Sequence, residues 1–369
     1  MQSFLWSHIS DDSYISFRYM RRFMDGKGLT FNDGERVEGF SHPLWIFLVA
    51  GCSKLSGFAV SNVARMIGLT VALLSVACLF VSRRALVFGN QIGAATIVLL
   101  LVFPGFHAYA TSGLETPLFM FLVTLGTVAS IAKPEPSALA SLSFGCAAIT
   151  RPEGILCGLA WFAIQLFSGR DLTRARLLRA CRQFAILLTP ALAYQVFRVM
   201  YFEAWLPNTF LAKLPGTFGS FLGLGYMLQV IMAVGGPFLL GALLVVVPTE
   251  SEDYRKVRRA AIGPILASAA FVFYAWGDWM PFSRFVVPVW PSLALLLASW
   301  LVTFSHSLNR EMIRLKPARI TALLTACIVA STLVMYGAQI KWYARNEGFD
   351  SMLMGAKISL ELEHGYQEC

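Results

Sequence analysis

The chain has 369 residues, of which 57% are hydrophobic and 14% charged, and its mean hydropathy is +0.63. These values lie outside the range of soluble domains and predict an all-α polytopic membrane protein. The apolar runs are continuous, without alternation of period two, which excludes an outer-membrane barrel. The net charge is +9, but the basic residues fall mostly in short loops between apolar runs, so no nucleic-acid partner is expected.

A dense polar segment follows a short start. The first ten residues, MQSFLWSHIS, hold too few apolar side chains to cross a membrane or to form a signal peptide. The chain therefore begins outside the membrane or lacks a first helix. Residues 11–45 then read DDSYISFRYMRRFMDGKGLTFNDGERVEGFSHPLW. Asp11 or Asp12 is predicted to cap a helix that ends near Met24, because an Asp side chain accepts hydrogen bonds from the first N–H groups of a helix.

The apolar runs after this segment predict the membrane-embedded part. Residues 44–60 are apolar but short and interrupted by glycine and lysine, so we expect a helix that lies in the membrane interface and does not cross. About ten spanning helices are predicted, at residues 62–82, 88–104, 117–131, 137–149, 155–168, 184–203, 235–249, 260–276, 286–304 and 320–338. The expected organisation is an outer loop at 1–61, a transmembrane bundle at 62–338 and a short outer tail at 339–369.

The basic residues predict the sidedness of the bundle. With residues 1–61 outside, nearly every basic cluster falls on the cytoplasmic side, as the positive-inside rule requires. The opposite face then carries the polar, Pro- and Gly-punctuated loops in which binding residues usually lie. These are residues 11–45, 110–116, 150–154, 206–213 and 277–284. We expect one composite site at this non-cytoplasmic face, next to the lipid bilayer.

Asp11 and Asp12 are the candidate catalytic residues. A carboxylate at the mouth of a helical bundle can act as a general base for a hydroxyl nucleophile. The two can also act as oxygen ligands of a divalent metal ion, Mg, Mn or Ca, that bridges to phosphate. At a helix start one of them can cap while the other faces a cavity. The alternative, that both only cap and remain solvated, stays open.

Three single cations on the same face are candidates for binding a phosphate group: Arg151, Lys213 and Arg284. Ionisable groups near membrane depth are costly, and those that are kept usually pair or bind a charged ligand. The alternative is ordinary pairing, of Arg151 with Glu153 and of Arg284 with Asp278, while Lys213 extends to the lipid headgroups.

The sidedness restricts the substrate. Neither ATP nor a nucleotide sugar is available on a face away from the cytoplasm, so an activated sugar must arrive attached to a lipid. Phosphate-binding cations and an acidic pair therefore suggest glycosyl transfer from a polyprenyl phosphate, by displacement at an anomeric carbon. Trp45, Trp205 and Trp279 can stack on the sugar ring, although tryptophan is also enriched at membrane interfaces.

The segment 11–45 resembles the first outer loop of GT-C integral membrane glycosyltransferases, in the branch of the mycobacterial terminal arabinofuranosyltransferase and related bacterial arabinosyl- and pilin-glycosylating enzymes. The later segments SGLET, TRPEG, LPNTFLAK and GDWMPFSRF match that branch in order, so the resemblance runs from Asp11 to about Pro291. It implies a GT-C helical bundle with juxtamembrane helices in the first loop. The other candidates for the substrate site are Arg18, Glu35, Arg36, Glu38, Glu115, Glu153, Asn208, Asp278 and Trp279.

The resemblance also implies a setting. The donor would be a polyprenyl-phosphate-linked sugar, with arabinofuranose as the leading sugar, and the acceptor a hydroxyl of a cell-envelope glycan or glycoprotein. The protein would lie in the bacterial inner membrane with its active site on the periplasmic face. Members of the branch usually have a helix before the acidic pair and a sizeable outer C-terminal domain, and His42 stands where they have asparagine.

Two other functions fit some of the same features. A transporter or flippase of lipid-linked sugars would share the cationic outer rim, but it predicts ionisable residues at the membrane midplane and broken helices in paired halves. A non-catalytic assembly subunit would tolerate replacement of both Asp11 and Asp12.

Overall fold

The computed structural model describes residues 9–131, 135–168, 173–211, 224–228, 251–275, 280, 282–311 and 316–345. These residues form helices and no strand, in agreement with the all-α prediction. In chain order the elements are α2 (Asp11–Met24), α3 (Pro43–Ser56), α4 (Val60–Ser82), η1 (Arg83–Ala85), α5 (Gly89–Leu101), α6 (Pro104–Ala110), α7 (Thr116–Ile131), α8 (Ala138–Ala148), α9 (Glu153–Phe167), α10 (Arg174–Phe202), α11 (Asn208–Leu211), α14 (Glu252–Tyr274), η2 (Val287–Val289), α15 (Trp290–Glu311) and α16 (Pro317–Arg345).

The predicted spans coincide with helices wherever the structure describes them; the span at 235–249 lies outside the described residues. Five helices in the described part are long and apolar enough to cross a membrane, and α5 with α6, bent by 68°, makes a sixth if the pair is one span. The other spans correspond to α7, α8 and α9, which are 16, 11 and 15 residues long. The chain is therefore a helical multi-pass bundle, and the number of about ten crossings stays a prediction.

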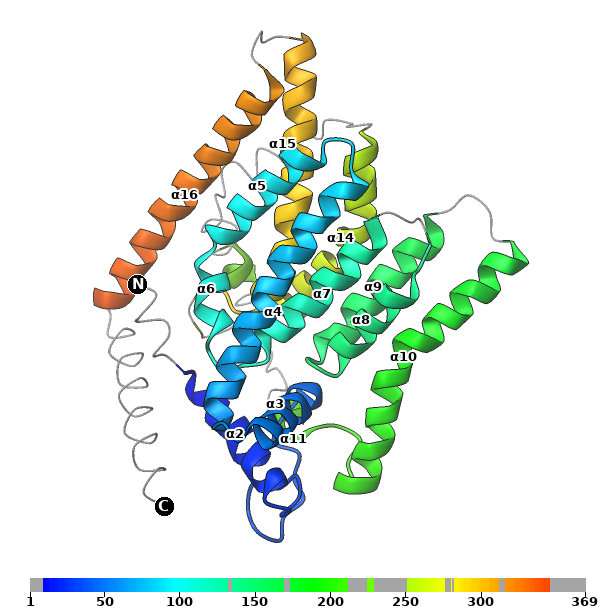
Figure 1. Ribbon diagram of the computed structural model, residues 1–369, viewed down its shortest axis with the longest axis vertical. Coiled ribbons are helices and arrows are strands. Elements are labelled where there is room, and N and C mark those ends of the chain that lie inside the picture. The colour runs from blue at the N-terminus through cyan, green and yellow to red at the C-terminus, as the bar shows by residue number, and fades with distance from the viewer. Residues whose placement is uncertain are drawn as a thin grey trace.

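The helices pack into one bundle (Figure 1). Its interior contains two hydrophobic clusters. One cluster joins α5 and α15, where the rings of Phe103 and Trp290 stack at 4.5 Å between centroids. The other joins α3, α7, α8 and α9 around Trp45 and Trp161. α9 and α14 approach closely because Gly263 faces the backbone of Ala160 and Trp161, where a Cβ atom would lie within 2.9 Å. α10 contacts the bundle through α8, and its C-terminal part packs against α3, where the rings of Phe47 and Phe197 meet.

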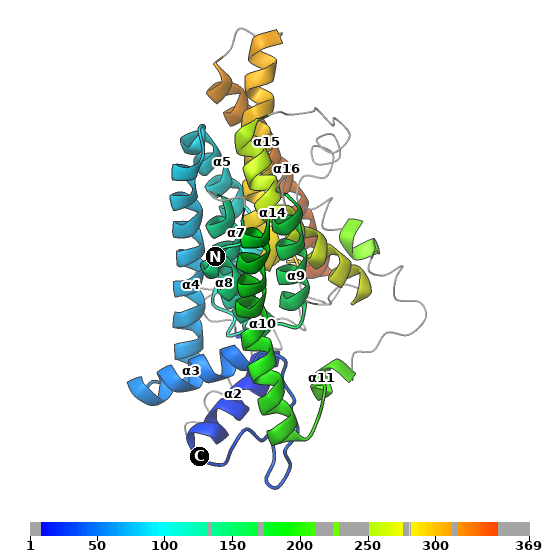
Figure 2. The same cartoon turned by 90° about the vertical axis from the view of Figure 1, so that its right-hand side faces the viewer.

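The first two described helices lie at one end of the bundle. α3 runs across the lower end of α4, nearly at right angles to it, and α2 lies below them (Figure 2). The 14-residue α3 ends at Ser56 and is capped by Gly57, whose φ of 73° falls in the left-handed region that favours glycine, and α4 begins at Val60. A helix is thus confirmed within residues 44–60, and its position in a membrane interface stays a prediction.

The start of α2 differs from the sequence prediction. Its end at Met24 is confirmed, but its N-cap is Ser10, so the prediction that Asp11 or Asp12 caps it is wrong. Both carboxylates lie in the first turn, where the positive end of the helix dipole favours negative charge. Asp11 Oδ1 accepts a hydrogen bond from the N–H of Asp12 at 2.9 Å. At the other end of the chain, α16 continues to Arg345, into the predicted tail, and residues 346–369 lie outside the described part.

Candidate active site at the α2 end of the bundle

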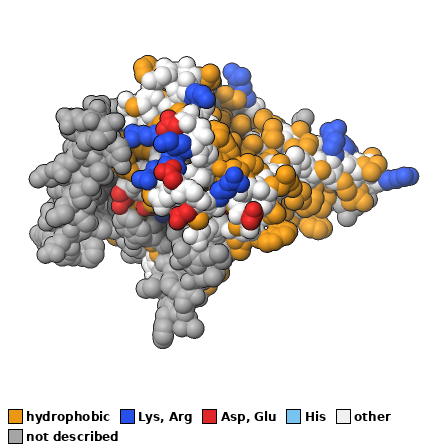
Figure 3. Space-filling view, turned by 90° about the horizontal axis from the view of Figure 1, so that it is seen from below, with side chains coloured by type: hydrophobic (Ala, Val, Ile, Leu, Met, Phe, Trp, Pro, Cys, Tyr) orange, Lys and Arg blue, Asp and Glu red, His pale blue; other side chains and the backbone are white. Residues whose placement is uncertain are grey.

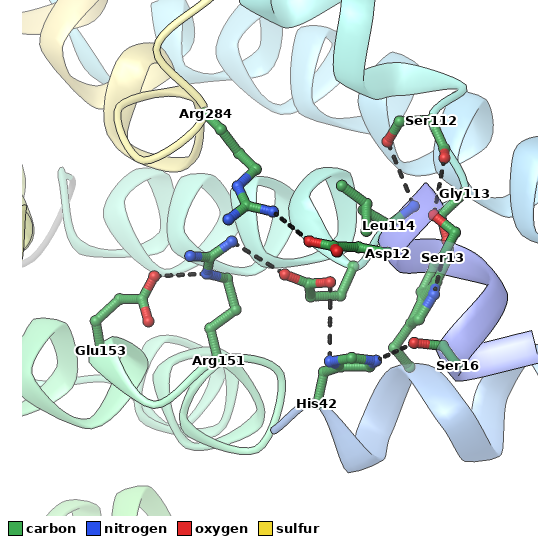
Figure 4. A network of polar contacts seen from close by, with 12 residues as sticks. Asp12, Ser13, Ser16, His42, Ser112, Gly113, Leu114, Arg151, Glu153 and Arg284 are labelled. Atoms are coloured by element: carbon green, nitrogen blue, oxygen red, sulfur yellow. Dashed lines mark hydrogen bonds and ion pairs between the residues drawn. The ribbon is translucent and has the colours of Figure 1, made fainter. Parts of the chain in front are cut away.

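The first turn of α2 brings Asp12 to a cation from the far end of the chain (Figure 4). Asp12 Oδ2 lies 3.7 Å from Nη1 of Arg284, which precedes η2. Arg284 is buried, with 7% of its surface exposed, whereas the Asp12 side chain is 44% exposed. Asp11 is exposed. Of the two acidic residues, Asp12 is therefore the one that combines a cationic neighbour with access for a substrate.

A buried ion-pair cluster lies beside this pair. Arg151 donates from Nε to Glu153 Oε1 at 2.5 Å and from Nη1 to Glu115 Oε1 at 3.0 Å. Arg151 thus pairs with Glu153, which was the predicted alternative to binding a phosphate group. The guanidinium carbons of Arg151 and Arg284 lie 5.2 and 5.3 Å from the ring centre of Phe285, within the range of cation–π attraction. Both arginines thus contact the same ring of Phe285. No charge pattern in the sequence indicated this shared contact.

His42 joins the cluster to α2. Its Nε2 lies 2.7 Å from the Ser16 hydroxyl oxygen, and its Nδ1 lies 3.9 Å from Glu115 Oε2 (Figure 4). Ser16 follows Asp12 by four residues, one helical turn. Neither His42 nor Ser16 is among the site residues predicted from the sequence; the only signal was that His42 departs from the asparagine of the branch it resembles.

The charges in this cluster keep Glu115 ionised. Burial alone raises the pKa of a carboxyl group, because it penalises the charged form. For Glu115 the nearby His42, Arg151 and Arg284 outweigh that effect, and the pKa falls below its ordinary value. Glu115 is therefore a carboxylate at neutral pH and serves as a fixed counter-charge for the two arginines.

The loop before α7 fastens the start of α2. The carbonyl oxygen of Ser112 accepts hydrogen bonds from the Ser10 N–H and the Ser13 hydroxyl, both at 3.0 Å. Gly113 has a φ of 82°, and a Cβ atom there would lie 3.0 Å from Phe17 and 3.1 Å from Ser13 Oγ. Only glycine fits both the backbone conformation and the close contact. The first turn of α2, and Asp12 with it, is thus held against the loop that carries Glu115.

The chain is similar in sequence to two curated proteins. No protein-family model matches the chain. It is 28% identical over 294 residues to the terminal β-(1→2)-arabinofuranosyltransferase of Mycobacterium tuberculosis, covering 69% of this chain and 45% of that protein. It is 27% identical over 233 residues to the enzyme of the same name from Corynebacterium glutamicum, covering 56% of this chain and 33% of that one. The chain thus spans less than half the length of these two curated relatives.

Two solved structures of ArnT from Cupriavidus metallidurans match over most of the chain. The apo structure has a TM-score of 0.56 and 15% identity, covering 90% of this chain and 74% of ArnT. The structure with bound undecaprenyl phosphate has a TM-score of 0.57 and 15% identity, covering 96% and 73%. The chain has the GT-C fold. The resemblance to the arabinofuranosyltransferase branch seen in the sequence motifs is likewise confirmed by the two curated relatives.

Four candidate residues of the first loop make contacts with α10 or within the loop itself. Glu38 is buried and accepts hydrogen bonds from Arg198 Nε and the Tyr194 hydroxyl of α10, both at 2.6 Å. Exposed Arg36 lies with its guanidinium 5.1 Å from the ring centre of Tyr201. The other two make contacts within the loop: Arg18 with Phe31 and Asn32, and Glu35 with Asn32. These residues shape the loop and dock it on α10, and seen from below the charged side chains gather on this face beside a largely hydrophobic flank (Figure 3).

We expect Glu38→Gln to lower the free energy of unfolding by about 3 kcal/mol, because removing one partner of a buried ion pair leaves the other charge uncompensated. Thermal unfolding in detergent measures this. Glu135→Gln is the control, since its partner Arg179 is 59% exposed and such a pair contributes little. Equal stability of the two variants would contradict a structural role for Glu38.

The remaining candidates are placed as follows. Asn208 begins α11, and its N–H donates to the Glu38 carbonyl oxygen at 3.1 Å. Trp45 is fully buried and donates to the Gly113 carbonyl oxygen, so the prediction that it stacks on a sugar is wrong. Trp205 is 76% exposed. Three candidates lie outside the described residues: Lys213, Asp278 and Trp279. The predicted pairing of Arg284 with Asp278 is therefore not tested.

The described part of the site does not fit a divalent metal ion. Within it, no three His, Cys, Asp or Glu side chains gather as a metal-binding group. Asp12 faces Arg284 and Glu115 faces Arg151, whereas Mg²⁺ or Ca²⁺ needs several oxygen ligands without competing cations. The metal ion expected from Asp11 and Asp12 stays an untested prediction.

Proposed function

We propose that this protein is a glycosyltransferase that moves a sugar from a polyprenyl-phosphate donor to a hydroxyl group of an acceptor. The observation that carries the proposal is the pair formed by Asp12 and Arg284, an accessible carboxylate beside a buried guanidinium at one end of a GT-C bundle. The ArnT structure with bound undecaprenyl phosphate supports a lipid-linked donor, because that protein has the same fold.

The proposed reaction is a direct displacement at the anomeric carbon of the donor sugar. Asp12 accepts the proton of the acceptor hydroxyl, whose oxygen forms the new bond to the anomeric carbon. The bond from that carbon to the phosphate oxygen breaks, and the phosphate leaves with the bonding electron pair. Arg284 stabilises the negative charge that develops on it.

The other residues divide between binding and support. Arg151 is engaged by two carboxylates and a ring, so we assign it to holding Glu115 and Phe285 in place and not to holding phosphate as the sequence suggested. Phe285 in turn packs against Arg284. Lys213 remains the second cation proposed for the donor phosphate.

Arabinofuranose is the sugar we propose, because both curated relatives are named arabinofuranosyltransferases. The proposed acceptor is a cell-envelope glycan or glycoprotein. We also propose that the α2 end faces the periplasm from the bacterial inner membrane. Three basic regions, at the end of α4, the start of α14 and the start of α16, lie at the opposite end of the bundle (Figures 1 and 2), which supports this orientation by the positive-inside rule.

The test is transfer by the purified protein in lipid nanodiscs, with polyprenyl-phospho-arabinofuranose as donor and oligo-arabinofuranosides as acceptors. We expect a product extended by one arabinose and release of polyprenyl phosphate, both detected by mass spectrometry. Donor that crosses the membrane of proteoliposomes without any transfer would support the flippase instead. Assays with EDTA and with added Mg²⁺, Mn²⁺ or Ca²⁺ test the predicted metal ion.

A further inference from the structure

The cluster formed by Asp12 and its charged neighbours has more negative than positive charge when His42 is neutral, and all of its members except Asp12 are buried. It contains two guanidinium groups and three carboxylates, contributed by four separate segments of the chain. The four buried members balance in charge, so an anion that binds beside them adds an excess negative charge that the protein interior solvates poorly. The members are Asp12 from α2, Glu115 from the loop before α7, Arg151 and Glu153 from the start of α9, and Arg284 from the segment before η2.

His42 is placed to correct this imbalance. The Ser16 hydroxyl can donate to a neutral Nε2 or accept from a protonated one, so this 2.7 Å contact holds the ring in both protonation states. Nδ1 lies 3.9 Å from Glu115 Oε2, and that contact becomes an ion pair only when the imidazole is protonated. The carboxylates around the ring favour the imidazolium form, while the two arginines oppose it.

We infer that His42 is a positioning residue that takes up a proton when the anionic donor binds and so supplies the third positive charge of the cluster. The inference rests on the proposed function, since the donor phosphate is the group that brings additional negative charge to Arg284. An imidazole ordinarily titrates at about pH 6.5, so it is the side chain of this cluster able to change charge near neutrality.

Donor binding and protonation of His42 are thermodynamically linked. Anion binding favours the protonated imidazole, so the affinity for the donor is highest below the imidazole pKa. It falls as the pH rises through the imidazole pKa of the complex, by up to about tenfold per pH unit for one coupled proton. Ser16 keeps the ring on α2, so the gain in charge also tightens the contact between the helix that carries Asp12 and the loop that carries Glu115.

The experiment uses farnesyl-phospho-arabinofuranose, whose phosphodiester keeps one negative charge over the pH range tested. For the wild type, KM and Kd for this probe are expected to rise several-fold between about pH 6 and 8. His42→Asn and His42→Gln are expected to give a KM independent of pH and close to the wild-type value at high pH, with kcat changed less than KM. His107→Asn is the control, because His107 is exposed and contacts the Leu101 carbonyl oxygen.

A second measurement needs no variant. Calorimetric titration of the wild type with the same probe, in buffers of different ionisation enthalpy, is expected to show uptake of up to one proton per donor near pH 7. Binding without proton uptake, or a pH slope retained in both His42 variants, would overturn the inference and leave the proposed function intact. A wild type that neither binds nor transfers the donor sugar would instead overturn the proposed function.

Discussion

Replacing Asp12 by Asn is expected to lower the rate of sugar transfer by about 10²–10⁴-fold, the usual contribution of a positioned general base. The amide has the size of the carboxylate but cannot accept the proton of the acceptor hydroxyl. Asp12 is 44% exposed and lies 3.7 Å from Arg284, so the fold should tolerate the change. The measurement is kcat in the transfer assay, with the thermal unfolding temperature as a check on folding.

Asp11→Asn is the matched comparison for this experiment. Asp11 is the neighbouring residue with the same side chain, but it is exposed and accepts a hydrogen bond from the Asp12 N–H within the first turn of α2. We expect a much smaller loss of rate than in Asp12→Asn. Equal losses in the two variants would contradict the assignment of the base to Asp12, and full activity of both would remove the acidic pair from the chemistry.

Arg151→Met is expected to produce the largest loss of stability among substitutions of single ion pairs described here. Arg151 is 6% exposed, and its removal leaves Glu115 and Glu153 buried without their cation, a change that costs about 3–5 kcal/mol. Thermal unfolding in detergent measures the effect. Arg179→Met is the control, because that arginine is 59% exposed and its pair with Glu135 is worth about 1 kcal/mol or less.

The same site offers a stricter test of the cause. The double change Arg151→Met and Glu153→Gln removes one buried carboxylate together with its cation and leaves Glu115 with Arg284, and it is expected to recover part of the stability lost in Arg151→Met. A double variant less stable than the single one would mean that packing against Phe285, and not uncompensated charge, explains the loss.

Much of the fold was predictable from residue patterns. Continuous apolar runs marked the positions of the spanning helices, and the end of α2 near Met24 was also predicted. The number of crossings was not predictable from the same runs, because α8 has 11 residues and its role depends on its neighbours. The N-cap of α2 was misassigned because aspartate is favoured both at the N-cap and in the first turn of a helix. The sequence pattern alone therefore does not distinguish the two positions.

The candidate site was predictable in outline only. Polar loops assigned to one face included Asp12, Glu115, Arg151, Glu153 and Arg284, which the structure brings together. Their pairings depend on distances between segments far apart in the chain, so the sequence could not separate a phosphate-binding Arg151 from one enclosed by carboxylates. His42 and Ser16 were missed because their importance arises from the contact between them and from Glu115, not from any local pattern.

The position of Arg284 has a consequence for biosynthesis. Asp12 leaves the ribosome early, and Arg284 follows only after α14 has been made, so the acidic residue spends most of translation without the cation it faces in the finished protein. Arg151, Glu115 and Glu153 are all available much sooner and can assemble once α9 is inserted. A nascent chain stopped just after α14 would thus contain Arg151, Glu115 and Glu153 but not Arg284, so the pair of Asp12 and Arg284 can form only after α14 has been made.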